Sequence, residues 1–336
     1  MKSLKYIFFL ILIAIIGSSV YIATLNGNYD IHESKTMKVP LSVVYKNIND
    51  FKNWEDWGPW YELDSTIIAT YPEKTSGIGA SYSWTGKDGT GSIKTIAVIK
   101  HKEIIQQIDF GSGTTPEVYW NFNSTKDSTE VIWGMRGISS FSEKIYWLIK
   151  GGIEKNMQPM YKRGLELLEI QLVKEMDKHS VEFKNEVDYG GGYYLYQTVS
   201  CRTEDAAKHT TKILPEIVAY MKMNHIEASG KPFKLNHQVD LLNNTVMFSV
   251  CIPVKERIVT EGTILTGFLA PQKTFKAIFK GNYKFLPTIW PDIYKTLEES
   301  GFEAVQKGSS FEIYTISAED TDNPTEWLTE IYIPIL

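Results

Sequence analysis

The chain has 336 residues, of which 43% are hydrophobic and 22% charged, and its formal net charge is -5. One hydrophobic core rarely grows to that size, so the length predicts two globular domains. The ordinary balance of apolar and charged residues excludes a largely disordered chain. A protein that binds nucleic acid usually carries an excess of basic residues. Because the excess here is acidic, we expect no nucleic-acid partner.

The first segment departs from this soluble composition. After two lysines among the first five residues, residues 6–25 contain no charged side chain. A helix of that length spans about 30 Å, the thickness of a bilayer's hydrocarbon core. Asp30 and Glu33 follow the run, so the positive-inside rule predicts a single-pass anchor at 1–25 in the cytoplasmic membrane, with the N-terminus inside and the domains in the periplasm or outside the cell. A cleaved signal peptide is the alternative, although its apolar region is usually only about 7–15 residues long.

Residues 26–177 have the patterning of a small α+β domain. A first strand is expected at 29–39, followed by a short helix that begins near Pro40. Between 67 and 136, short apolar runs separated by Gly, Asp, Lys and Ser are typical of an antiparallel meander. A long helical stretch closes the domain, with a break at the glycine pair 151–152. The six expected meander strands are 67–70, 80–85, 91–100, 103–110, 117–124 and 129–136.

Three segments of this domain resemble START-like proteins of the polyketide-cyclase/SRPBCC superfamily. They are 43–60 (VVYKNINDFKNWEDWGPW), 77–84 (GIGASYSW) and 160–168 (MYKRGLELL). The resemblance implies a helix-grip fold, in which an antiparallel sheet curls around a long helix and encloses an apolar cavity. It makes four tryptophans candidates to line that cavity, and the alternative is that each simply fills the core. These are Trp84, Trp120, Trp133 and Trp147.

The remaining residues, 181–336, contain an internal duplication. Residues 246–254 (VMFSVCIPV) are echoed by 327–335 (WLTEIYIPI), and an expected helix precedes each segment. Each copy reads strand, helix, strand, strand, and each ends near a proline, which has no N–H to donate and so suits the end of a strand. Repeats at about 183–255 and 264–336 therefore predict a duplicated βαββ domain with pseudo-two-fold symmetry.

This duplicated pattern resembles the GyrI-like domain, which also serves as the effector-binding domain of AraC- and MerR-type regulators. Four motifs carry the likeness: 273–279 (KTFKAIF), 281–283 (GNY), 311–314 (FEIY) and 329–334 (TEIYIP). The resemblance implies a groove between the two repeats that binds a hydrophobic or cationic small molecule. It also implies a buried glutamate, surrounded by aromatic side chains, as the anchor for that ligand.

Glu312 is the candidate for this anchor. Because side chains alternate along a strand, Glu312 and Tyr314 share one face and Phe311 and Ile313 the other. Burying a carboxylate is unfavourable unless a cation or a donor meets it, and a cation stacked on aromatic rings would do so. The alternative is a glutamate on an exposed strand face. Lys234 stands at the matching position of the first repeat, so no second acidic site is expected there. The predicted ligand-binding residues, whose convergence is implied by the resemblance, are Glu312, Tyr314, Tyr283, Trp290, Trp327 and Tyr332.

The sequence predicts a membrane-anchored sensor or sequestering protein, with no catalytic residues, metal or cofactor. The six histidines show no metal-ligand spacing. Cys201 and Cys251 leave open a disulfide or two buried thiols. One alternative is a hydrolase of electrophilic small molecules, in which Glu312 with Tyr314 or Tyr332 activates water. A second alternative is an interaction protein whose START-like pocket is vestigial.

Overall fold

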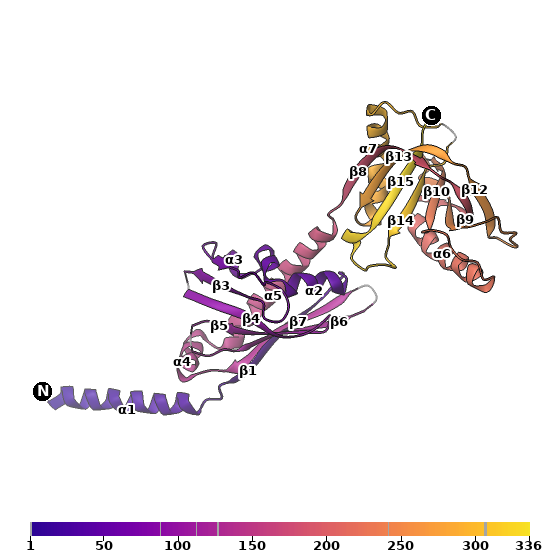
Figure 1. The fold of residues 1–336 in the computed structure, drawn as a ribbon. Coiled ribbons are helices and arrows are strands. Elements are labelled where there is room, and N and C mark those ends of the chain that lie inside the picture. The colour runs from indigo at the N-terminus through magenta and orange to yellow at the C-terminus, as the bar shows by residue number, and fades with distance from the viewer. Residues whose placement is uncertain (1, 88, 112, 126–127, 241, 306–307) are drawn as a thin grey trace. The chain divides into compact units, whose positions relative to one another are not determined.

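A computed structural model of the chain describes residues 2–87, 89–111, 113–125, 128–240, 242–305 and 308–336. The chain forms two compact units, residues 1–175 and 176–336, each built around one antiparallel sheet (Figure 1). The fold class is therefore α+β, with one apolar helix ahead of the first sheet.

The apolar helix is α1 (Lys2–Thr24). Its segment Lys5–Thr24 has a mean hydropathy of 2.4, and none of it is buried in the protein. By length and composition this segment can cross a membrane. A signal sequence near the N-terminus meets the same two criteria, so the helix by itself establishes no topology.

The first unit contains a seven-stranded sheet, in which six consecutive strands form a meander and the first strand of the chain lies at one edge, beside the last. The order is β1-β7-β6-β5-β4-β3-β2, and every neighbouring pair is antiparallel. The six meander strands expected from the alternation pattern are confirmed, because turn residues interrupt the pattern between successive strands. The strands are β1 (Asn28–Met37), β2 (Ile68–Thr70), β3 (Ser81–Gly86), β4 (Gly89–Ile99), β5 (Glu103–Asp109), β6 (Glu117–Ser124) and β7 (Thr129–Ile138).

The helices of this unit follow the expected order. The break at the glycine pair is confirmed, since Gly151 adopts a φ of +83° and ends one helix before the next begins. The helices are α2 (Leu41–Asn49), the 3-10 turn η1 (Phe51–Asp56), α3 (Trp60–Leu63), α4 (Phe141–Lys150) and α5 (Ile153–Met176).

Two of the four candidate cavity tryptophans fill the core of the first unit. Trp120 and Trp133 are register partners on β6 and β7, and their rings stack at 4.4 Å. Tyr161 of α5 packs on Trp133 at 4.6 Å, so the long helix lies directly against this pair. Trp84 and Trp147 remain partly exposed. For Trp120 and Trp133 the core-filling alternative therefore holds.

The second unit contains an eight-stranded antiparallel sheet. Its order is β12-β9-β11-β10-β14-β15-β13-β8. The central pair, β10 and β14, joins an N-terminal half to a C-terminal half. The strands are β8 (Ser180–Tyr189), β9 (Gly192–Arg202), β10 (Phe233–Asp240), β11 (Thr245–Val254), β12 (Leu265–Leu269), β13 (Gln272–Lys280), β14 (Phe311–Ile316) and β15 (Leu328–Pro334).

Each half contains one strand more than the pattern strand, helix, strand, strand. The extra strands β8 and β12 are the two edges of the sheet, and each pairs with the other half: β8 with β13 and β12 with β9. Strand β8 begins at Ser180, slightly ahead of the first repeat expected from about 183.

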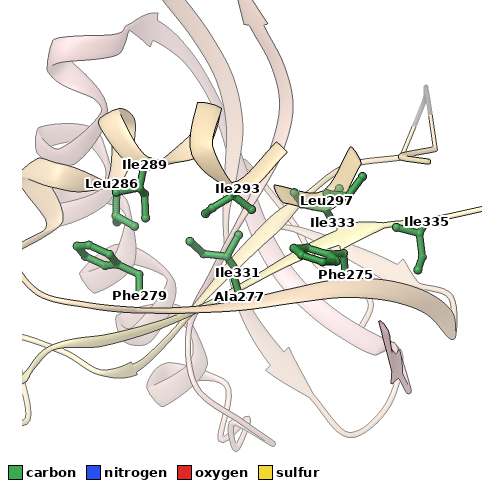
Figure 2. Packing of buried hydrophobic residues seen from close by; sticks show 10 residues of the cluster. All are labelled: Phe275, Ala277, Phe279, Leu286, Ile289, Ile293, Leu297, Ile331, Ile333 and Ile335. Atoms are coloured by element: carbon green, nitrogen blue, oxygen red, sulfur yellow. The ribbon is translucent and has the colours of Figure 1, made fainter. Parts of the chain in front are cut away.

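One face of this sheet is covered by two helices, α6 (Ala206–Met223) and α7 (Leu286–Glu299). Leu286 and Ile289 of α7 point toward Phe279 of β13, and Ile293 lies above Ala277 and Ile331 (Figure 2). On α6, one buried face meets strands β9 and β11 in the same way; that face consists of Ile213, Ile217 and Met221. The two helices thus lie on either side of the central β10–β14 pair.

The two cysteines are free thiols. They lie on neighbouring strands, but Cys201 is the register partner of Val246, and Cys251 that of Tyr196. Five positions along a strand correspond to about 16 Å, well beyond the reach of a disulfide.

Candidate functional site

Glu312 lies on β14 near the centre of the sheet and is fully buried. Three donors surround its carboxylate. The indole Nε1 of Trp290 on α7 donates to Oε1 at 3.1 Å, and the Tyr314 hydroxyl donates to Oε2 at 3.1 Å. The Lys234 ammonium lies 2.9 Å from Oε2. A buried carboxylate needs such partners, because an unpaired charge in a protein interior is strongly unfavourable.

Lys234 is the site residue that sequence reasoning did not include. It is the direct register partner of Glu312 across β10 and β14, so both side chains rise from the same face of the sheet. Its ammonium lies 5.7 Å from the centre of the Phe248 ring, and its side chain is 19% exposed, whereas that of Glu312 is 0% exposed. The long Lys234 side chain therefore has a route to solvent that the carboxylate lacks.

An aromatic group lies beside this carboxylate. Tyr283 and Trp327 stack with their ring centres 4.5 Å apart, and Tyr283 lies 5.3 Å from Tyr314. The hydroxyls of Tyr283 and Thr329 are buried without a hydrogen-bond partner among the described residues. Thr329 is the register partner of Tyr314, so it belongs to the same face. A buried hydroxyl without a partner costs roughly 1–3 kcal/mol.

Burial keeps the two tyrosine hydroxyls of this group protonated. Desolvation raises the pKa of Tyr314 well above its ordinary value, and the neighbouring Glu312 carboxylate raises it further. Desolvation likewise raises the pKa of Tyr283, with smaller contributions from the charges of Asp320 and Glu312. Both groups are therefore hydrogen-bond donors at any physiological pH.

Tyr332 does not join this group. It is the register partner of Phe311, and the two rings stack at 4.9 Å, whereas Ile331 is the partner of Glu312. Since successive residues alternate, Tyr332 lies on the opposite face of the sheet from Glu312. Of the six predicted ligand-binding residues, the structure thus brings five together, namely Glu312, Tyr314, Tyr283, Trp290 and Trp327.

On that opposite face, Tyr332 belongs to a second ion-pair cluster. Its hydroxyl donates to Glu330 Oε2 at 2.6 Å, and the Lys276 ammonium lies 2.8 Å from Glu330 Oε1. Burial alone would raise the pKa of Glu330, but the hydrogen bonds from Lys276 and Tyr332 outweigh it and lower that pKa. This cluster has the same residue types as the Glu312 site but lacks its tryptophans.

Two hollows in the surface lie away from Glu312. One of about 500 Å³ belongs to the first unit and is lined by residues that include Tyr29, Glu117 and Arg136. Another of about 250 Å³ belongs to the second unit and is lined by residues that include Tyr189, Tyr194 and Phe233. The Glu312 carboxylate is instead packed closely by its own neighbours, so a ligand that reaches it has to displace one of them.

Potential metal ligands lie scattered across the part of the chain that the structure describes. Within it, no three His, Cys, Asp or Glu side chains come together as potential ligands.

Comparison with known proteins identifies the second unit. Residues 193–336 match the family model described as a GyrI-like small molecule binding domain, so this part of the chain is a GyrI-like domain. No curated protein matches the chain.

Solved structures resemble the chain at low identity. A complex of EcmrR with DNA is 17% identical, with a TM-score of 0.42, and the match covers 58% of this chain and 70% of the other. The EcmrR C-terminal domain is 18% identical, with a TM-score of 0.41 and coverage of 47% and 97%. The protein SAV2435, solved with tetraphenylphosphonium, is 11% identical, with a TM-score of 0.35 and coverage of 46% and 94%.

Proposed function

We propose that the GyrI-like unit senses or sequesters a small aromatic or amphipathic cation, which it binds at Glu312. The observation that supports this most is a carboxylate with no exposed surface, held by Trp290, Tyr314 and Lys234. Lys234 supplies the positive charge in the structure, and its side chain, which is 19% exposed, has a route to solvent. A ligand cation would take over the ammonium's place, and the Tyr283–Trp327 stack would receive its rings.

The proposal includes a membrane anchor and a START-like first unit. Helix α1 has the length and composition of a spanning helix. Lys2 and Lys5 precede its apolar run, and Asp30 and Glu33 follow it, which favours a cytoplasmic N-terminus. A reporter joined after Leu336 is expected to be active only on the far side of the membrane, and activity in the cytoplasm would reverse the topology. The START-like assignment of residues 26–177 is supported by their order of strand, short helix, meander and long helix.

Glu312→Gln tests the binding proposal. With tetraphenylphosphonium as the probe, we expect the affinity of the full chain to fall about 10- to 100-fold, the worth of one charge-assisted contact. Glutamine keeps the size of the side chain and one hydrogen-bond acceptor, so the loss of affinity measures the contribution of the negative charge. The affinity for tetraphenylborate, an anion of the same size, should not fall. Isothermal titration calorimetry in detergent measures the affinities for both ions, and thermal unfolding checks that the variant is folded.

Glu330→Gln provides the matched control for that experiment. Glu330 is also paired with a lysine and a tyrosine, but it lies on the other face of the sheet. The control variant should bind the cation as the unaltered chain does. Equal losses in both variants, or no loss in Glu312→Gln, would remove the acidic site from the proposal.

Hydrolysis is the second candidate function, and one contact favours it. The Tyr314 hydroxyl lies 3.1 Å from Glu312 Oε2, which places the two groups that the hydrolase hypothesis requires in contact. All three described partners of the carboxylate are donors, an arrangement that holds an anion in place, so we favour binding. Turnover of an activated ester that disappears in Glu312→Gln would reverse this preference.

A further inference from the structure

Helix α4 turns its apolar side toward solvent. At about 100° per residue, Phe141, Ile145, Leu148 and Ile149 fall on one stripe of the helix. Three of them, Phe141, Leu148 and Ile149, are 47%, 52% and 77% exposed, and none of the ten residues of α4 is buried. Ile138, just ahead of the helix, is 69% exposed. A helix of a soluble domain normally turns such a stripe to the core. This stripe is left open to an external partner.

The helix is well defined and fixed next to the end of α1. The Ser140 side chain and Glu143 form a capping box at its start. The Ser139 amide donates to the Gly27 carbonyl at 2.8 Å. The Lys144 ammonium donates to the Leu25 carbonyl at 2.6 Å. These bonds tie α4 to the residues that directly follow the apolar helix.

That attachment limits the choice of partner. Helix α1 ends at Thr24, and Gly27 is three residues later. Three extended residues span at most about 11 Å, so the start of α4 lies within about that reach of the end of α1. If α1 crosses a bilayer, the boundary between the lipid headgroups and the acyl chains is therefore an apolar surface within reach of α4.

The remaining side chains of α4 suit that surface. Tyr146 and Trp147 pack edge to face at 4.8 Å. Lys144 and Lys150 add positive charge, and Lys150 lies over the Tyr146 ring. Aromatic residues concentrate at the membrane interface, and lysines extend along such helices toward lipid headgroups.

We propose that α4 lies in the headgroup region of the membrane that α1 spans, with Phe141, Leu148 and Ile149 inserted at the acyl boundary. This inference rests on the proposed anchor and goes beyond it. A helix bound at the surface gives the first unit a second contact with the bilayer, so this unit is held against the membrane and does not swing on a flexible tether.

Fluorescence in lipid vesicles tests this inference on the full chain. A nitrobenzoxadiazole probe is attached to Ile149→Cys in a Cys201→Ser background, in which the remaining Cys251 is fully buried. Lipids that carry a shallow doxyl group should quench this probe several-fold more than a probe at Ile99→Cys. Ile99 is also exposed, but the strand register places it level with Ser34, about 20 Å along the sheet from Asn28. A third probe at Ile13→Cys, near the middle of the apolar run, is read with lipids that carry the doxyl group deep in the acyl chain, and it reports whether α1 is inserted.

The three probes separate the possible results. Quenching at positions 13 and 149, with little at 99, supports the inference. Strong quenching at position 13, with equally weak quenching at 149 and 99, overturns the membrane contact of α4 but keeps the anchor. The exposed stripe would then be assigned to a protein partner. Strong quenching at all three positions also overturns it, because the contact is then nonspecific. No quenching at 13 overturns the anchor and this inference together.

Discussion

Replacing Lys234 by methionine is expected to raise the affinity for tetraphenylphosphonium about tenfold or more, while the ligand-free protein loses about 3 kcal/mol of stability. Both effects have one cause. Methionine keeps the length of the side chain but removes the ammonium that lies 2.9 Å from the buried Glu312 carboxylate. The carboxylate is then buried without its cation. The ligand no longer competes with an internal ammonium, and it restores the missing charge when it binds.

Two comparisons isolate this cause. Lys276→Met breaks the equivalent pair on the other face, where Lys276 and Glu330 are 17% and 24% exposed, and should leave the affinity for the cation unchanged. The double variant Lys234→Met with Glu312→Gln should recover part of the lost stability, since no unpaired charge remains. Urea unfolding without and with tetraphenylphosphonium measures the stability of each variant and its stabilisation by the bound ligand. Unchanged affinity in Lys234→Met would mean that Lys234 does not compete with the ligand.

Sequence reasoning reached Glu312 but not its partner, although the necessary observation was available. The internal duplication aligned Lys234 with Glu312 as equivalent positions of the two repeats. The structure pairs β10 and β14, the strands that carry them, as antiparallel neighbours at the centre of the sheet. In a pseudo-symmetric sheet, equivalent positions on the two central strands face each other near the axis. The difference in charge between the repeats therefore creates an ion pair, and does not merely remove a second site.

Tyr332 illustrates what the sequence could not provide. Alternation correctly placed Tyr314 on the face of Glu312, because both residues belong to one strand. Tyr332 is on the neighbouring strand β15, and its face depends on the register between the strands. A shift of one residue would reverse that face, and no residue pattern within β15 fixes the register. The structure pairs Tyr332 with Phe311, on the far side from the carboxylate.

The difference between a pattern within one strand and the pairing between strands also explains which strands of the fold the sequence predicted. Strands in the meander of the first unit follow one another, so local alternation and turn residues suffice to predict them. Strands β8 and β12 have their partners in the opposite half of the second unit. The short β12 and the largely polar β8 gave no strong local signal, and the exchange of edges became apparent only from the pairing. Strand exchange also makes the connections between the halves important for stability.

Gly191→Ala is expected to lower the free energy of unfolding by about 2–4 kcal/mol, from the sum of a strained backbone and a steric clash. Gly191 lies in the connection from β8 to β9, which leads from one edge of the sheet into the other half. Its φ is +70°, a region that alanine enters only with strain. An added Cβ would also overlap the Leu269 carbonyl oxygen and lie 2.8 Å from the Pro271 nitrogen. These are backbone atoms of the connection from β12 to β13, which cannot turn aside as a side chain could.

Gly190→Ala is the neighbouring control, because a Cβ there has no atom within 4 Å and its φ lies outside the strained region. Its effect should stay within about 0.5 kcal/mol. Urea denaturation of the two variants, followed by the circular dichroism of the full chain, gives the comparison. A similar small loss in both would mean that the two connections do not approach each other closely. A large loss of stability confined to Gly191→Ala would show that this contact holds the exchanged edge strands in place. These strands join both halves of the sheet on which Lys234 meets Glu312.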